Sequence, residues 1–452
     1  VTLKDDFQNL NDVVVIGYGS AKAKDLTSPI TVVKAADIKS TPSSSPMTAL
    51  QGKVAGVNVV SSGTPGAGPT VRIRGTGSFA NSSPLYVVDG MFYDDINFLN
   101  NEDIQEMSIL KDASAAAIYG VRAANGVVII TTKKGTKNQK AQITYDGYIG
   151  FQKATNVLEM ANSQEYATML MEANYDAYSP TMKAAIDRFG GSYADSDFHK
   201  WTYGADTDWY KELLRTAVIT NHSVGISGGS DKATYSLGIS YLYQDGVMDT
   251  ENNYKRLNFR AAVDYDATNW LKVGFNGVFS KSDQVLPNNA AWREAFNTPG
   301  IIPVFDEQNT QAFPDKYATP NSIGLSTNFK NPVATAKYYD AKNEMRQYMT
   351  NFYAQINLLP QKLNFKTNIS YNFQDINGSV FTPTYYVSDS QQSNTSNLNK
   401  SNSQYSSYIW DNTLTYKDSY GKHNFGAMLG ASMRQETYKN LWGNATGVPE
   451  GS

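Results

Sequence analysis

The sequence predicts an antiparallel membrane β-barrel preceded by a compact, mixed α/β domain. From residue 142 onward, long segments alternate apolar and polar side chains, as in residues 363–373, where Leu363, Phe365 and Ile369 share one face. The connections between these segments are alternately long and short. Residues 20–135 instead combine short strand-like and helix-like pieces with frequent Gly, Ala, Ser and Val. Two kinds of structure therefore meet near residue 140.

Composition narrows the class of protein. The chain has 452 residues, with 39 Lys and Arg against 42 Asp and Glu, so it lacks the basic excess that nucleic-acid binding requires. The absence of cysteine excludes disulfides, thiolate metal sites and thiol catalysis. The longest apolar runs, such as Val13–Ile16, fall far short of the ~20 residues of a membrane helix. Aromatic residues make up 12% of the chain, which favours β-structure.

Short elements are expected in the first domain. Strands are predicted over 57–60, 70–74, 85–88 and 127–132. Short helices are predicted over 46–51 and 112–119, with Ser45 and Asp112 as their N-caps. Glycines between these pieces, including Gly75, Gly90 and Gly126, indicate turns.

Nine long strands are expected after this domain. Most exceed the ~5–6 residues of an average soluble strand and reach the ~9–11 that a tilted strand needs to cross a bilayer. They are predicted over residues 142–153, 218–228, 232–243, 254–266, 270–282, 346–359, 362–375, 404–416 and 422–436.

The connections between these strands separate by length. Long ones (154–217, 244–253, 283–345 and 376–403) alternate with short ones (229–231, 267–269, 360–361 and 417–421). All short turns therefore fall on one edge of the sheet, as in outer-membrane barrels. A soluble antiparallel sandwich is the alternative, but it has no reason to segregate its loops in this way. Because a bilayer leaves no water for unpaired strand edges, we expect further strands beyond this chain to close the barrel.

Several motifs carry a resemblance to a known family. They are Asn11-Asp-Val-Val-Val-Ile-Gly-Tyr-Gly19, the segment from Ala49 to Val59, Arg72-Ile-Arg-Gly75, Leu85-Tyr-Val-Val-Asp-Gly90, and the segment from Ser108 to Gly135. Looser matches follow in Thr207-Asp-Trp-Tyr210 and Ser227-Gly-Gly-Ser230. In this order they resemble the Ton box, the plug signatures and the early barrel of SusC/RagA-type TonB-dependent outer-membrane transporters.

The resemblance implies a domain organisation and partners. Residues 1–10 would be the tail of a carboxypeptidase-regulatory-like domain, 11–20 the Ton box, 21–137 a plug inside the lumen, and 138–452 the first part of a barrel expected to have 22 strands. TonB would bind the Ton box residues Asp12, Val13, Val14, Val15, Ile16, Gly17, Tyr18 and Gly19. Energy would come from the inner-membrane proton gradient through TonB, ExbB and ExbD, with no cofactor. A SusD-like surface lipoprotein would act as a lid over the transporter, which resides in the outer membrane of a Gram-negative bacterium.

Enzymatic and metal chemistry find little support. His199, His222 and His423 are isolated, so no zinc triad or histidine relay can be written from local spacing. The glycines at Gly17-Tyr-Gly19 and in residues 63–68 lack the rest of a dinucleotide or phosphate-loop motif. The carboxylate pairs Asp94–Asp95 and Asp206/Asp208 suit a loop Ca²⁺ or sugar hydroxyls, although such pairs are more often solvated. We therefore expect a protein that is not an enzyme.

Candidate ligand-binding residues cluster in two places. The expected plug apex, residues 75–83 and 91–100, offers Phe92, Tyr93, Asp94, Asp95 and Asn97, an aromatic and amide set that suits a sugar. The long loops offer Trp201, Trp292, Tyr338 and Tyr385, for which packing or a membrane-interface girdle is the alternative.

Three functions follow from these residues and the resemblance. They are import of oligosaccharides, import of oligopeptides as in the RagA branch, and a surface receptor that does not transport. The Ton box argues against the third, and the sequence does not separate the first two.

Overall fold

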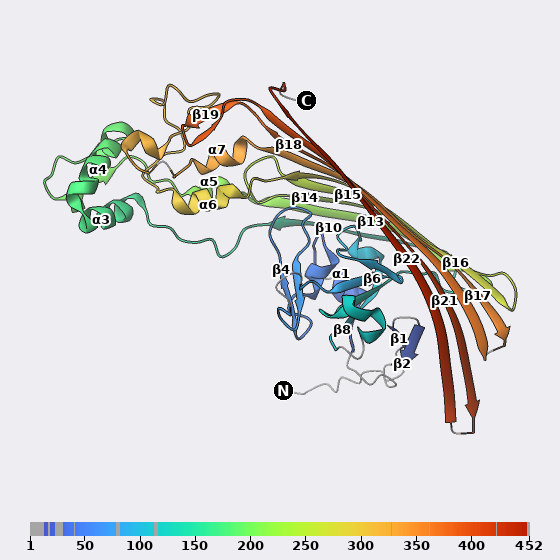
Figure 1. Cartoon of the computed structure of the whole chain (residues 1–452). Helices are drawn as coiled ribbons and strands as arrows, with labels where there is room; N and C mark the ends of the chain where they lie inside the picture. Colours follow the sequence, from blue (N-terminus) through green and yellow to red (C-terminus); the bar gives the residue numbers. More distant parts are fainter. Residues whose placement is uncertain are drawn as a thin grey trace, which may run out of the picture.

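The structure, a computed structural model, describes residues 13–16, 19–22, 30–39, 41–77, 82–112, 116–326, 328–360, 362–421 and 423–449. A domain of short elements lies against one face of a long, curved antiparallel sheet, and most helices gather beyond one end of that sheet (Figure 1). We call these two parts the N-terminal domain (residues 30–132) and the wall. Within the described residues, no helix combines the length and apolar character needed to cross a membrane.

The N-terminal domain is built on a five-stranded sheet in the order β3-β8-β9-β6-β7. The expected strands over 57–60, 85–88 and 127–132 are confirmed, and that over 70–74 ends one residue early. Strands β3, β7 and β8 were not predicted. The elements are β3 Ile30–Lys34, α1 Ala35–Lys39, η2 Pro46–Leu50, β4 Val57–Val60, β5 Thr70–Ile73, β6 Leu85–Val88, β7 Met91–Tyr93, η3 Asn101–Asp103, β8 Ile104–Leu110, η4 Ala117–Ala123 and β9 Val127–Thr132.

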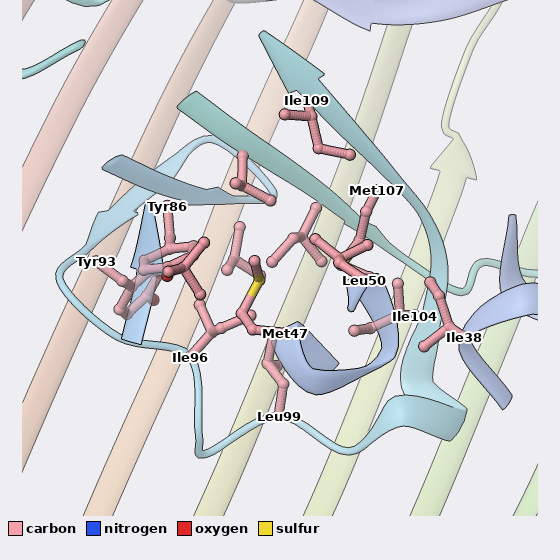
Figure 2. Close-up of a cluster of buried hydrophobic side chains, with 14 of the residues drawn as sticks. Ile38, Met47, Leu50, Tyr86, Tyr93, Ile96, Leu99, Ile104, Met107 and Ile109 are labelled. Carbon is pink, nitrogen blue, oxygen red and sulfur yellow. The ribbon is translucent and has the colours of Figure 1, made fainter. Parts of the chain in front are cut away.

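Apolar side chains from helices and strands form the core of this domain (Figure 2). Ile38, Leu50 and Ile109 have no exposed surface, and Met47 is only 2% exposed. Full burial of one such side chain contributes about 1.5–3 kcal/mol. The predicted helix at 46–51 is present as the 3₁₀ helix η2, with Pro46 in its first turn.

A tight hairpin begins the segment 91–100, which we expect at the plug apex. Asp89 and Gly90 both have positive φ (47° and 92°), the backbone of a type I′ turn, which joins β6 to β7. Met91–Tyr93 is therefore a strand of the sheet rather than a loop. Tyr93 is 6% exposed and its ring lies 5.0 Å from that of Phe98, so it belongs to the core.

The wall is a single nine-stranded sheet, open in this chain, in which neighbours in sequence pair antiparallel. All nine predicted strands are confirmed. Together they form one open sheet rather than a closed barrel. The strands are β10 Gln142–Gln152, β13 Ala217–Gly229, β14 Ala233–Asp245, β15 Asn253–Asp266, β16 Leu271–Leu286, β17 Asp340–Leu359, β18 Leu363–Thr382, β21 Asn397–Tyr420 and β22 His423–Thr446.

Several wall strands extend further toward the long connections than predicted. Strand β17 begins at Asp340 rather than 346, and β21 begins at Asn397 rather than 404. Residues in the extension of β17, such as Lys342 and Glu344, are charged and therefore break the apolar alternation. Strand pairing continues past the apolar band because backbone hydrogen bonds do not depend on which side chains are present.

The two faces of the wall have opposite polarity. On the outer face Phe259, Phe352 and Ile369 are 48%, 55% and 49% exposed. On the inner face Asn258, Ser370 and Asn372 are only 1–2% exposed. The predicted alternation in β18 is thus confirmed, with apolar side chains outside and polar ones inside. Aromatic pairs, including Phe275 with Phe352 at 4.7 Å, link neighbouring strands on the outer face.

The predicted segregation of loop lengths is confirmed. Short turns (230–232, 267–270, 360–362 and 421–422) lie at one end of the wall, and long connections (153–216, 246–252, 287–339 and 383–396) lie at the other. We call these the short-turn end and the long-loop end.

The longest connections contain helices that the sequence analysis did not predict. Trp201, Trp209, Ile301 and Ile302 are buried among them in a separate apolar cluster. The elements are α3 Ser163–Ala173, α4 Tyr175–Phe189, β11 Gly191–Ser192, η5 Phe198–Lys200, β12 Thr202–Tyr203, α5 Trp209–Leu213, α6 Ala290–Asn297, η6 Pro320–Ile323, α7 Pro332–Lys337, β19 Tyr385–Ser388 and β20 Gln391–Ser393.

Candidate functional site

The predicted Ton box contains a strand. Val13–Ile16 (β1) pairs antiparallel with Gly19–Lys22 (β2), in a two-stranded sheet separate from that of the N-terminal domain. Asp12, Gly17 and Tyr18 lie outside the described residues. Binding of TonB to this segment stays a prediction.

The aspartate of the Leu85–Gly90 motif joins the N-terminal domain to the wall. Asp89 accepts hydrogen bonds from the backbone N–H of Thr132 at 3.1 Å and from its hydroxyl at 2.7 Å. The side-chain amide of Asn276, on the inner face of β16, donates to the same carboxylate and also to the Thr132 hydroxyl at 3.2 Å. One carboxylate thus fixes the hairpin turn, strand β9 and the wall together.

A buried ion pair joins the two parts through β15. Arg260 Nε lies 2.9 Å from Asp103 Oδ1, and their side chains are 3% and 7% exposed. Arg260 also donates to the backbone oxygen of Lys133 at 2.6 Å and to Ser236 Oγ at 2.9 Å. The guanidinium is therefore satisfied from three directions, as a buried charge requires.

A second ionic contact lies on β10. Lys39 Nζ is 2.7 Å from both Glu102 and Asp146. Burial raises the pKa of the Glu102 carboxyl, and the hydrogen bond and charge of Lys39 oppose that rise. The contact therefore holds a partly buried carboxylate in place.

The contact with β16–β22 has a different character. Val278, Met349 and Ile409 on the inner face are at most 3% exposed and join the apolar core of the N-terminal domain. Near the edge, the guanidinium of Arg434 lies 5.0 Å from the Phe92 ring centroid, and Arg122 pairs with Glu436 at 2.9 Å. The predicted apex residue Phe92 is thus a contact with the wall.

A cavity of about 620 Å³ opens where the N-terminal domain meets the long-loop end of the wall. Its lining is rich in hydroxyl and amide side chains, and Lys153 is the one charged residue among the described residues that line it. Tyr210 and Trp292 also line the cavity, with ring centroids 6.4 Å apart and ring planes at 18° to each other. The polar lining residues are Ser43, Ser44, Thr48, Ser61, Ser62, Thr64, Gln152, Thr155, Asn156, Gln244, Asn252 and Asn289.

Hydrogen bonds between the N-terminal domain and the wall fix the residues that line this cavity. The backbone N–H of Gly66 donates to Gln244 Oε1 at 3.0 Å, and Gln244 Nε2 donates to Gln152 Oε1 at 3.1 Å. Gln284 donates to the Pro65 carbonyl at 2.6 Å. Loop 63–68 is therefore fixed against the wall at the cavity.

The predicted loop aromatics have different surroundings. Trp292 lines the cavity, whereas Trp201 is 3% exposed and donates to the Asp195 carbonyl at 2.9 Å. Tyr338 is 7% exposed, donates to the Asp315 carboxylate at 2.8 Å, and stacks on Tyr385 at 4.4 Å. Of these four, Trp292 alone contributes to the described cavity lining.

The carboxylates predicted to bind a ligand or Ca²⁺ are either exposed or bonded to nearby residues. Asp94 and Asp95 are exposed, and Asp95 accepts from the backbone N–H of Asn97 at 2.8 Å. Asp206 accepts from Ser163 at the start of α3, and Asp208 caps α5 by accepting from Lys211 N–H. No group of three His, Asp or Glu positioned to hold a metal occurs among the described residues. A ligand role for Asp94, Asp95 and Asn97 stays a prediction.

Sequence reasoning missed most of the cavity lining. Ser43 and Ser44 directly precede the predicted helix over 46–51 and Thr48 lies within it, and nothing in that pattern indicated a ligand. Tyr210 stands in the motif Thr207-Asp-Trp-Tyr210, but spacing alone did not bring it near Trp292. The pairing of β14 with β15 and the packing of α5 against α6 place these residues together.

Comparisons with known proteins agree with this architecture. Residues 22–127 match the family described as the TonB-dependent Receptor Plug Domain. The chain is 33% identical over 347 residues to the TonB-dependent receptor SusC of Bacteroides thetaiotaomicron, covering 74% of this chain and 32% of that protein. It is 32% identical over 448 residues to the TonB-dependent receptor P3 of Formosa agariphila, covering 96% of this chain and 41% of that protein.

Solved structures give the same result. The RagAB peptide importer in its open-open state matches with a TM-score of 0.78 and 25% identity, covering 96% of this chain and 50% of that one. Its closed-closed state matches with a TM-score of 0.76 and 26% identity, covering 93% and 49%. The chain thus spans at most half the length of these relatives.

Proposed function

Because this chain belongs to the SusC/RagA family of TonB-dependent receptors, which are proteins of the Gram-negative outer membrane and not enzymes, we propose that it serves the active import of oligosaccharides across that membrane. The short-turn end would then face the periplasm and the long-loop end the cell exterior. The outer membrane holds no ATP, so the energy would come from TonB.

The lining of the cavity is the observation that carries the glycan assignment. A sugar presents C–H faces to aromatic rings and hydroxyls to amide and hydroxyl groups. Trp292 and Tyr210 offer such rings, and the neutral polar residues around them offer both donors and acceptors. A cavity of about 620 Å³ also falls in the ordinary range of small-ligand sites.

The strand in the Ton box supports energy coupling. In strand addition, main-chain hydrogen bonds carry the load between two proteins, so a short β-prone segment suffices. Strand β1 pairs with β2 along one edge, and no further strand pairs with it among the described residues. The other edge of β1 is the proposed point of attachment for TonB.

The long connections support a lipoprotein lid of the SusD type. Residues 153–162 run without helix or strand between β10 and α3, and Val157, Leu158 and Met160 on this segment are 40–59% exposed. Exposed apolar side chains in sequence are typical of an interaction surface. A lid over this segment would close the cavity from outside.

Oligopeptides are the second candidate ligand. The RagAB structures that match this chain are those of a peptide importer. A bound peptide carries charged termini and side chains, for which the described lining offers little beyond Lys153. We therefore rank the oligosaccharide first.

Calorimetry on the purified complex of this protein with its lipoprotein lid can decide between the two ligand classes. A mixture of neutral oligosaccharides should bind, a mixture of short peptides should not, and Trp292→Ala should weaken sugar binding at least tenfold. Trp270→Ala, at the short-turn end and 52% exposed, is the matched control and should leave the affinity unchanged. Binding of peptides alone would replace the proposed ligand class.

Deleting residues 12–19 tests the energy coupling. Growth on the imported nutrient should be abolished while binding at the cell surface persists, because the cavity lies away from the Ton box. Normal import by the deletion strain would exclude the TonB mechanism.

A further inference from the structure

The floor of the cavity continues into a contact between the N-terminal domain and the first strands of the wall. Ser43 and Ser44 line the cavity, and their backbone oxygens also accept from the wall, Ser43 from Tyr148 at 3.4 Å and Ser44 from Arg256 at 3.0 Å. Arg256 donates in addition to the Asn97 carbonyl. We call the contact of residues 39–45 and 97–103 with β10–β15 the polar interface.

The polar interface contains buried groups without partners. Ser45 Oγ, Asn100 Nδ2 and Asn101 Oδ1 make no hydrogen bond in the described part of the chain, although these residues are at most 5% exposed. On the wall, Asn221 Oδ1 is also buried without a hydrogen-bond partner, and Asn221 lies opposite Tyr148 in the pairing of β13 with β10. A buried polar group without a hydrogen-bond partner is unfavourable, so water or a ligand hydroxyl is expected beside it.

Ser45 and Asn100 occupy the N-cap positions of η2 and η3, where a side-chain oxygen ordinarily accepts a hydrogen bond from the first turn. Neither side chain does so here. Ser45 Oγ is therefore available to a molecule in the interface without loss of a cap, and the unpartnered Asn100 Nδ2 is a donor that takes no part in capping.

The contact between the N-terminal domain and β16–β22 can be compared with the polar interface. Gln347 and Ser407 also hold unpartnered buried atoms there, so such atoms alone do not distinguish the two contacts. Apolar packing does, because Val278, Met349 and Ile409 share the core of the N-terminal domain. Separating that contact would expose apolar surface to water, whereas the hydrogen bonds and ion pairs of the polar interface, including Arg260 with Asp103, can be replaced by hydrogen bonds to water.

We propose that the polar interface is the route by which the ligand passes the N-terminal domain. The domain parts from β10–β15 and stays attached to β16–β22, and a neutral hydroxylated ligand leaves the cavity along Ser45, Asn100, Asn101 and Asn221. This inference rests on the proposed import function and adds the location of the path within the described wall.

Cross-linking can test the route, since the chain contains no cysteine. The pair Lys39→Cys with Asp146→Cys, bridged by a short bis-maleimide, ties the polar interface closed. The matched pair Arg122→Cys with Glu436→Cys replaces another ion pair, on β22. Uptake should fall at least tenfold after bridging the first pair and stay within twofold after bridging the second, each relative to the same variant before bridging.

The other outcomes overturn the proposal. Equal loss in both variants would mean that the domain leaves the wall as a whole. Loss in the Arg122 pair alone would move the route to β16–β22, and loss in neither would exclude both. Uptake is measured with neutral oligosaccharides and with short peptides, so a wrong ligand class shows in the unmodified protein and a wrong route shows only after bridging.

Thiol labelling gives a second, independent readout. Ser45→Cys should react with a membrane-impermeant maleimide during TonB-driven uptake and should be protected in cells without TonB. Ser108→Cys is the control, because Ser108 is 1% exposed on the inner strand β8 and its hydroxyl also lacks a partner. Equal labelling of both cysteines would indicate general unfolding and contradict the proposed route.

Discussion

The N-terminal domain and the wall distribute the same residue types in opposite ways. In the domain, Ile109 and Leu50 are buried in the core, and Asp103 is buried where it pairs with Arg260 of the wall. In the wall, Ile239 and Phe259 are about half exposed on the outer face, whereas Asn258 and Arg260 are buried on the inner one. The difference teaches that burial in this chain does not report hydrophobicity alone. It reports which surface meets lipid and which meets the domain in the lumen.

The largest expected effect concerns the buried charge pair. Asp103→Asn should destabilise the docked domain by about 3–5 kcal/mol, because it leaves Arg260 buried and without a counter-charge. The urea concentration at which the domain becomes sensitive to protease measures this loss. Glu307→Ala removes the exposed pair with Lys316 and should cost under about 1 kcal/mol. Equal effects would mean that the inner face is as hydrated as the loops.

A charge on the outer face should have the next largest effect. Ile369→Lys should destabilise the protein in a bilayer by about 2–4 kcal/mol, because Ile369 is exposed on the face assigned to lipid. Asn368→Lys, one residue away, directs the charge to the lumen and should cost much less. Unfolding in vesicles measures both, and a reversed order would exchange the two faces of β18.

The smallest expected effect comes from removing one methylene group in each of the two regions. Ile109→Val should cost about 0.5–1.5 kcal/mol, because Ile109 is fully buried in the core. Ile239→Val should be close to neutral, since Ile239 is 51% exposed and lipid fills the space. Denaturation of the two variants side by side provides the measurement. A larger loss at Ile239 would indicate a packed partner on the outer face.

Much of this fold could be predicted from alternation and loop length. Period-2 patterning identified all nine wall strands, since a two-faced sheet imposes that period directly. Strand β7 was missed because its three residues are too few for a period-2 pattern, although Gly90 was predicted to lie in a turn. The extensions of β17 and β21 were missed because the residues there are mostly polar or charged and do not alternate with apolar ones.

The candidate site was predictable only in part. Trp292 was identified because an isolated loop tryptophan suits a ligand surface. The same reasoning selected Trp201, which is buried among helices and does not line the cavity. The cavity combines residues from segments as distant as Ser43 and Trp292. Strand register and helix packing bring such segments together, and neither can be obtained from composition or spacing.

The segregation of short turns and long loops has a consequence for how such a protein diversifies. Turns such as 230–232 fix the register of the wall, so an insertion there would displace every contact with the N-terminal domain. The connections 153–216 and 287–339 carry Tyr210 and Trp292 and begin and end on strands already paired. Descendants of one gene can therefore lengthen, shorten or exchange these connections and acquire new ligands while inheriting the same wall.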